Sequence, residues 1–221
     1  MKLLNPLSLA LLLSLGSVNA GVILVDIGST TQTTSGQPEA WNNLTDYALN
    51  GTVAGGLVDT TGANTTYQLT ITTSGFTGPA ANDGSGNQTL TPTTASYDSF
   101  FGGGTASVLR LSNLDTSLTY SFTFFGSVFR NDSTNRNTAY TVGSQTVSLQ
   151  TRNNAATWSN TISGIAPDVN GNIDITIARG AGNTGSSYLI NILKVESVPE
   201  PSHAVLSLAG VSLMTLRRRR A

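Results

Sequence analysis

The sequence predicts an all-β protein, a two-sheet antiparallel β-sandwich that lies between two hydrophobic ends. Apolar residues recur with a period of two along many short segments, and turn-forming glycine and asparagine residues separate these segments. The segments are rich in Val, Ile, Thr, Tyr and Phe, as half-buried strands usually are. Short strands with regular turns and without repeating helices are typical of two packed sheets.

The individual strands are predicted from this alternation. It is clearest in residues 118–124, where leucine and aromatic residues alternate with threonine and serine, so that the apolar set shares one face. Residues 173–177 alternate three isoleucines with an aspartate and a threonine in the same way. Similar residue types predict further strands at 22–27, 67–72, 107–111, 138–142, 145–150, 157–162 and 188–195.

Turn signals and one candidate helix complete this outline. Gly143-Ser144 stands between two alternating segments, which predicts the tip of a hairpin. Asn170-Gly171 predicts a tight reversal in which both residues take positive φ. Residues 38–49 are the one segment of the body that favours a helix. The body has no internal repeat, and its length suits a single domain.

The first twenty residues have the features of a cleavable signal peptide. Lys2 gives a positive start, residues 7–15 form a short apolar run, and small residues stand at Val18 and Ala20. The predicted cut lies between Ala20 and Gly21, which leaves residues 21–197 as the β-sandwich domain. An apolar run this short does not span a bilayer permanently. An uncleaved N-terminal anchor or a buried helix is the alternative interpretation.

The last residues, 198–221, combine three elements in a fixed order. A proline-rich box precedes an apolar segment at 202–216, and a basic cluster closes the chain. As a helix this segment is about 22 Å long, which is shorter than the bilayer's hydrocarbon core of about 30 Å. Local thinning of the bilayer, and arginines that extend their charged ends to the headgroups, can accommodate such a helix. Adjacent arginines resist translocation and stay cytoplasmic. The box and the cluster consist of Pro199, Glu200, Pro201, Arg217, Arg218, Arg219 and Arg220.

This arrangement resembles the PEP-CTERM sorting domain of Gram-negative bacteria that make extracellular polysaccharide. The resemblance covers about a tenth of the chain. It implies passage through the export machinery, transient anchoring in the inner membrane by the tail, and processing by an exosortase-like membrane enzyme that recognises the box. The protein is then expected at the cell surface or outside the cell. A simple tail anchor is the alternative.

Composition excludes several classes of function. Between residues 21 and 198 there are six basic and eleven acidic residues, a net charge of about −5, which argues against a nucleic-acid partner. Cysteine is absent, and the single histidine, His203, lies in the tail. The body therefore has neither a Ser-His-Asp nor a Cys-His arrangement, and no histidine or thiolate ligands for zinc. We expect no catalytic residues, no metal site and no cofactor.

The order of the pieces along the body carries a second resemblance. An opening strand leads to a tryptophan-asparagine segment, and an aromatic strand and a turn precede the closing strand; these pieces lie at 23–28, 41–43, 111–125, 165–171 and 188–195. The order resembles bacterial jelly-roll domains of the malectin-like or galactose-binding-like kind, which implies a jelly-roll-like sandwich with carbohydrate contacts on loops. No binding residue can be matched by position, so sugar binding is not carried over with the fold.

One segment offers oxygen ligands of the kind that calcium prefers. Asp168, Asn170, Asn172 and Asp174 alternate along it. An EF-hand loop has its glycine at the sixth position, whereas Gly171 is the fourth residue from Asp168. A hairpin at Asn170-Gly171 explains the same residues and the isoleucine alternation that follows, so we favour the hairpin over a metal site.

The two tryptophans are the candidates for stacking on a sugar ring. Trp158 lies in a strand-like segment, which favours a place in the core. Trp41 lies among polar residues and is the candidate ligand contact.

These observations favour a non-enzymatic surface or matrix protein with a structural or adhesive role. The alternative is a carbohydrate-binding module that acts on secreted or envelope polysaccharide. A hydrolase is the third hypothesis. It needs two carboxylates at a set separation, and the spacing of the eleven acids in the body singles out no pair.

Overall fold

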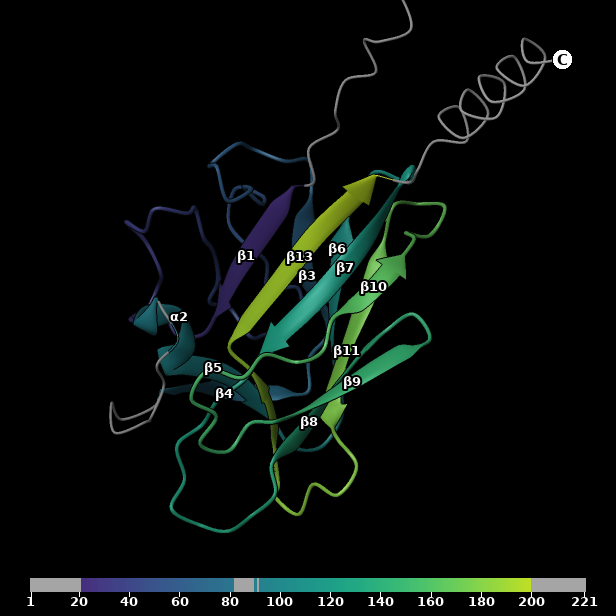
Figure 1. The fold of residues 1–221 in the computed structure, drawn as a ribbon. Helices are drawn as coiled ribbons and strands as arrows, with labels where there is room; N and C mark the ends of the chain where they lie inside the picture. Colours follow the sequence, from purple (N-terminus) through teal and green to yellow (C-terminus); the bar gives the residue numbers. More distant parts are fainter. Residues whose placement is uncertain (1–20, 82–89, 91, 200–221) are drawn as a thin grey trace, which may run out of the picture.

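The computed structural model describes residues 21–81, 90 and 92–199, which form a β-sandwich (Figure 1). One sheet has the strand order β10 (Ile162–Ile165), β7 (Leu118–Phe125), β13 (Ile192–Pro199), β1 (Val22–Ile27) and β2 (Asn42–Leu44). The facing sheet has the order β3 (Gln68–Thr73), β6 (Ser107–Ser112), β11 (Ile173–Arg179), β8 (Asn137–Val142) and β9 (Gln145–Gln150). The predicted all-β sandwich is confirmed.

A third sheet and a short helix add to the two predicted layers. The third sheet has the order β12 (Tyr188–Ile190), β5 (Asp98–Gly102) and β4 (Phe76–Ala81), and α2 (Thr93–Tyr97) leads into β5. Strand pairing is antiparallel except between β1 and β2, which run parallel. This smaller sheet lies near one end of the sandwich (Figure 1).

The core lies between the two large sheets because alternate residues of each strand point inward. In β6 buried and half-buried residues alternate strictly, and in β11 the three isoleucines are the buried set. Phe124 of β7 stacks on Tyr140 of β8, with ring centroids 4.4 Å apart and the planes nearly parallel. Tyr140 is fully buried and donates a hydrogen bond from its hydroxyl to the carbonyl of Leu189 at 2.8 Å. The contact therefore ties both large sheets to the third.

Three predicted elements differ from the structure. The helix expected at 38–49 is wrong: β2 occupies part of this segment, and the Asn42 side chain donates to the carbonyls of Leu24 and Val58, which fixes the segment beside β1. The strand expected at 157–162 begins only at Ile162. The closing strand expected at 188–195 is divided at Asn191 into β12 and β13, which belong to different sheets.

One predicted turn is confirmed and another needs correction. β8 and β9 pair up to the Gly143-Ser144 tip, and Gly143 has a φ of 59°. At the second turn only Gly171 takes a positive φ, 73°, whereas the sequence predicts positive values at both residues. The Gly171 amide donates to the carbonyl of Asp168 at 2.9 Å, so Asn170 lies inside a wider turn that closes on a left-handed glycine.

The first and last strands of the body are neighbours, which brings Gly21 and Ser197 together. The Gly21 amide donates to the Ser197 hydroxyl at 2.8 Å, and the Ser197 amide donates to the Gly21 carbonyl at 2.9 Å. The predicted signal peptide up to Ala20, and the tail beyond Pro199, fall outside the described residues. In the part that the structure describes, no helix has the length and apolar character needed to cross a membrane.

Candidate functional site

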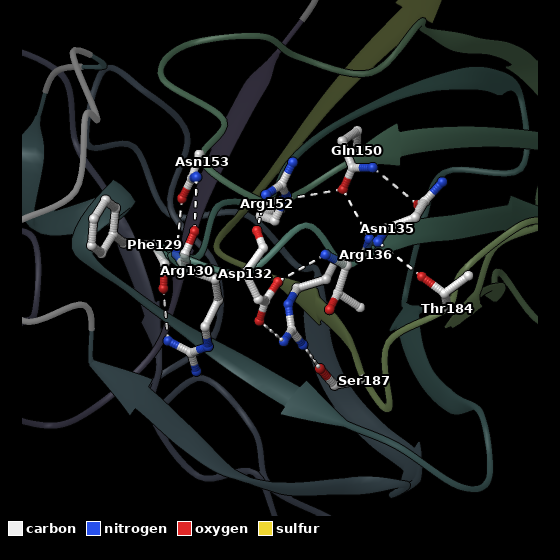
Figure 2. A network of polar contacts seen from close by, with 11 residues as sticks. Phe129, Arg130, Asp132, Asn135, Arg136, Gln150, Arg152, Asn153, Thr184 and Ser187 are labelled. Atoms are coloured by element: carbon white, nitrogen blue, oxygen red, sulfur yellow. Dashed lines mark hydrogen bonds and ion pairs between the residues drawn. The ribbon is translucent and has the colours of Figure 1, made fainter.

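Four of the six basic residues of the body gather at the end of the sandwich opposite Gly21 and Ser197. At this end β7 stops at Phe125 and β13 starts at Ile192, and these two residues pair. The segments after β7, after β9 and before β12 meet here, as Figure 2 shows from close by. Together with the last residue of β11 they contribute Arg130, Arg136, Arg152 and Arg179.

Asp132 holds two of these arginines in place. Its carboxylate accepts a hydrogen bond from Nη2 of Arg136 at 3.0 Å, and its carbonyl accepts one from Arg152. The bond from Arg136 holds the pKa of Asp132 below its ordinary value, and the amide of Thr134 adds to this effect. Arg136 also donates from Nη1 to the Ser187 hydroxyl at 3.3 Å. The Arg136 guanidinium is therefore fixed from two sides (Figure 2).

Arg130 has a fixed backbone and an exposed side chain. Its amide donates to the Asn153 side-chain oxygen at 2.8 Å, and the Asn153 amide group donates to the Arg130 carbonyl at 2.9 Å. Nη1 of Arg130 donates to the carbonyl of Phe129 at 2.8 Å. Among the described residues no carboxylate lies within ion-pair distance of Arg130. In Figure 2 its guanidinium points to the same side of the loop as that of Arg136.

A cavity of about 240 Å³, called the arginine cavity below, lies between the segment that follows β7 and the third sheet. Its apolar wall consists of Ala80, Phe101, Val128 and Leu189, and its polar wall consists of Ser99, Arg130, Arg136, Ser186 and Ser187. Two atoms of these wall residues, Oγ of Ser99 and Nε of Arg136, are buried and have no hydrogen-bond partner in the described structure. The cavity therefore combines an apolar surface with two guanidinium groups and several hydroxyls.

A second polar cluster, with two buried carboxylates, lies at the end of β1. Asp26 accepts a hydrogen bond from the Thr34 amide at 2.9 Å, and Asp98 accepts one from the Ser29 amide. Both side chains are almost fully buried, and Oδ1 of each has no partner among the described residues. Burial raises the pKa of Asp26 to about 7; Asp98 adds to the rise, and Thr34 opposes it. A Cβ atom at Gly28 would collide with the Asp98 carboxylate.

The two carboxylates do not form a recognisable metal centre. Within residues 21–81, 90 and 92–199, no group of three or more His, Cys, Asp or Glu side chains comes together. Burial also raises the pKa of Asp98, although hydrogen bonds from Ser29 oppose the rise. At acidic pH, protonation of Asp26 removes its buried negative charge, so the carboxyl group needs no cation beside it.

Asn191 connects the strands around these carboxylates. Its side chain is fully buried and donates to the carbonyls of Ser96 and Asp98, and it accepts a hydrogen bond from the Ser127 amide at 2.7 Å. The Asn191 carbonyl accepts a hydrogen bond from the amide of Ile27 at 2.8 Å. One residue at the break between β12 and β13 thus satisfies backbone groups from three neighbouring segments.

The predicted ligand contact, Trp41, lies outside the arginine cavity. It is half-buried and packs, with Trp158, against a small cluster that includes Phe125 and Ile192. Nε1 of Trp41 is buried and has no partner in the described structure. The Trp158 ring lies 5.7 Å from the ring of Phe125, which gives it a packing role. The role of Trp41 as a ligand contact stays a prediction.

The residues weighed as calcium ligands have other partners. Oδ1 of Asp168 accepts hydrogen bonds from the backbone amides of Asn170 and Asn172, at 2.8 and 2.9 Å. Asp174 forms a two-point ion pair with Arg110 on the neighbouring strand, with both distances 2.7 Å. Asp168 therefore stabilises the turn, whereas Asp174 stabilises a strand pair.

The residues of the arginine cavity were not found from the sequence. A signal was present, because three of the six basic residues of the body fall between Arg130 and Arg152. Ser99 and Ser187 come from distant parts of the chain, and only the folded sheets bring them to the same cavity.

Comparison with known proteins yields similarity of fold. No protein-family model and no curated protein matches the chain. The ANX2 ectodomain from Arabidopsis thaliana superimposes with a TM-score of 0.51 at 11% identity, over 82% of this chain and 50% of that one. YXIM from Bacillus subtilis gives a TM-score of 0.46 at 12% identity, over 80% and 40%. The CBM35 of Abf62 from Cellvibrio japonicus gives 0.32 at 19% identity, over 59% and 92%.

The chain thus spans half or less of the first two of these structures. The similarity to the ANX2 ectodomain supports the sandwich fold that the sequence predicts.

Proposed function

We propose that this chain is an exported surface or matrix protein that is sorted through its PEP-CTERM tail and has a structural or adhesive role. The observation that supports this proposal is the position of the two ends of the body. Gly21, the first residue after the predicted cut, is hydrogen-bonded to Ser197, two residues before the Pro199-Glu200-Pro201 box. The predicted signal peptide and the sorting tail therefore join the sandwich at the same end. The loops at the opposite end point away from the membrane while the tail is anchored.

Sorting is tested by the location of the full-length protein in cells of an exosortase-containing bacterium. An epitope tag inserted at the exposed Gly143-Ser144 tip reports the location of the body, whether or not the tail is removed. Replacing Pro199, Glu200 and Pro201 by alanine is expected to shift the protein from the surface and medium to the inner-membrane fraction. The measured mass of this variant is expected to include the uncleaved tail.

The chain offers a matched control for this experiment. Pro38 and Glu39 form the same dipeptide in an exposed loop of the body. Their replacement by alanine is expected to leave the location unchanged. An identical distribution of the box variant and the wild type would contradict the sorting proposal.

A second candidate function is supported by the cavity at the end opposite the tail. We propose that the body binds polysaccharide there, as a carbohydrate-binding module does. The wall residues combine an apolar surface with hydroxyl and guanidinium groups, which suits a sugar ring with its polar substituents. Retention of the full-length protein on a glycan array, in mild detergent, tests this function. Weaker retention after Trp41→Ala would show that the contact surface also includes Trp41.

A further inference from the structure

We propose that the cavity beside Arg130 and Arg136 binds a sugar unit that carries a carboxylate or a sulfate group, so that the ligand is an acidic polysaccharide. This inference rests on the proposed carbohydrate-binding function and adds the chemical class of the ligand. Four features carry it: the distribution of charge, the state of the two guanidinium groups, the unpaired buried atoms, and the walls of the cavity.

The distribution of charge is uneven for a body with so few basic residues. The body has a net charge of about −5, yet four of its six basic residues, Arg130, Arg136, Arg152 and Arg179, lie in or next to the loops at this end of the sandwich. The other two are paired on the sheets, Arg110 with Asp174 and Lys194 with Glu196. Among the described residues, none of those that line the cavity is acidic. An anion is therefore repelled by most of the surface and attracted at this position.

The two guanidinium groups are prepared for an anion in different ways. Asp132 and Ser187 hold Arg136 in one orientation, so little side-chain entropy is lost when a ligand binds. Arg130 donates to a backbone carbonyl and, among the described residues, is not neutralised by a carboxylate. A guanidinium presents a planar set of donors that matches a carboxylate or sulfate with two parallel hydrogen bonds.

Unpaired atoms at the cavity support the same conclusion. Oγ of Ser99 and Nε of Arg136 are buried and lack a partner in the described structure. A buried polar group without a hydrogen bond costs about 1–3 kcal/mol. A small shift of either side chain toward a ligand oxygen would remove this cost, which favours an oxygen-rich ligand.

The remaining walls fit a sugar ring better than an inorganic anion. Phe101, Val128 and Leu189 provide an apolar surface for the C–H face of a ring, and the hydroxyls of Ser186 and Ser187 face its polar substituents. The volume of about 240 Å³ is below that of pockets for drug-sized ligands. The cavity therefore accepts a single sugar unit, and the rest of the polymer lies along the outside.

The test compares two polymers that differ only in their charged group. Polygalacturonate and its carboxyl-reduced, neutral form share one backbone, and dextran sulfate with dextran forms the corresponding sulfated pair. Binding of the full-length protein in mild detergent is measured by affinity electrophoresis or biolayer interferometry at low and high salt. We expect retention by at least one charged polymer, weaker retention at high salt, and at least tenfold weaker binding to its neutral partner.

Variants identify the residue responsible. Arg130→Gln is expected to weaken binding of the charged polymer roughly tenfold or more, as the loss of a hydrogen-bonded charge contact predicts. Arg130→Lys is expected to restore part of the affinity. Arg110→Gln makes the same change of charge on β6, outside the cavity, and is expected to leave binding within about twofold. Cooperative melting transitions well above the temperature of the binding assay would show that the variants remain folded.

The outcomes separate this inference from the function on which it rests. Equal binding of charged and neutral polymers, unaffected by Arg130→Gln, would overturn the inference and leave the polysaccharide function standing. Absence of binding to both charged polymers would also overturn it, while the glycan array decides the function separately. Retention of one charged polymer that is lost in Arg130→Gln but not in Arg110→Gln would support the inference.

Discussion

Replacing Asp26 by asparagine is expected to remove most of the pH dependence of stability between pH 4 and 7. Asp26 is buried beside β2, and burial raises its pKa to about 7, against about 3.9 in an unfolded chain. Between these two values the folded protein binds a proton that the unfolded chain has lost. The free energy of unfolding therefore falls as the pH rises through this window, and the protein is more stable at pH 4.5 than at pH 8.

The size of the effect follows from the difference between the folded and the unfolded pKa of Asp26. A tenfold difference in proton affinity corresponds to about 1.4 kcal/mol, so a rise of the pKa from about 3.9 to about 7 predicts a loss of about 4 kcal/mol between the acidic and the alkaline limit. This is a large part of the roughly 5–15 kcal/mol that stabilises a typical domain. Burial also raises the pKa of Asp98, so this residue changes the free energy of unfolding with pH in the same direction. Exposed carboxylates with a lowered pKa, such as Asp168, act with the opposite sign and below about pH 4.

The assay is urea unfolding of the full-length protein at several pH values, followed by tryptophan fluorescence. The asparagine side chain keeps the shape of the aspartate and can still accept the Thr34 amide, so Asp26→Asn is expected to be more stable than the wild type at pH 8. Asp46→Asn changes an exposed aspartate and serves as the control. If the wild type and Asp26→Asn lose the same free energy between pH 4.5 and 8, the reasoning from burial is wrong.

Three further substitutions test the packing and the polar contacts, each by its urea midpoint. Tyr140→Phe leaves the buried Leu189 carbonyl without its donor and is expected to cost about 1–3 kcal/mol; a change below about 0.5 kcal/mol would contradict the role of this bond. Arg110→Gln breaks an exposed pair with Asp174 and is expected to cost less than about 1 kcal/mol, an effect that salt at about 1 M removes. Asn191→Leu loses three buried side-chain hydrogen bonds and is expected to cost more than about 3 kcal/mol, so a wild-type midpoint would refute its connecting role.

The large sheets were predictable because their strands bury one face each. β11 has its isoleucines in the core and its polar residues outside, which is the alternation that the sequence presents. β4 contains a glycine and a proline, and β5 is buried on almost every residue, so neither alternates and the third sheet was missed. The break at Asn191 was also hidden, because the residues on both sides are apolar and only tertiary contacts divide them.

The candidate site was less predictable than the fold. Arg130 and Arg136 are close in sequence, but nothing local predicts that a serine before β12 and another in β5 will share a cavity with them. The buried carboxylates of Asp26 and Asp98 were also missed. Asp26 lies inside a strand pattern, where an aspartate is normally interpreted as an outward-facing residue, and no local signal placed Asp98 near it.

The adjacency of the first and last strands also bears on how this domain can be re-engineered. Because Gly21 and Ser197 are already in contact, a linker of a few residues would join them without strain. New ends could then be opened at the exposed Gly143-Ser144 tip, which gives a circularly permuted sandwich with the same pairing of strands. Such a permutant would present a fused cargo from the β8–β9 hairpin, free of the two original exit points.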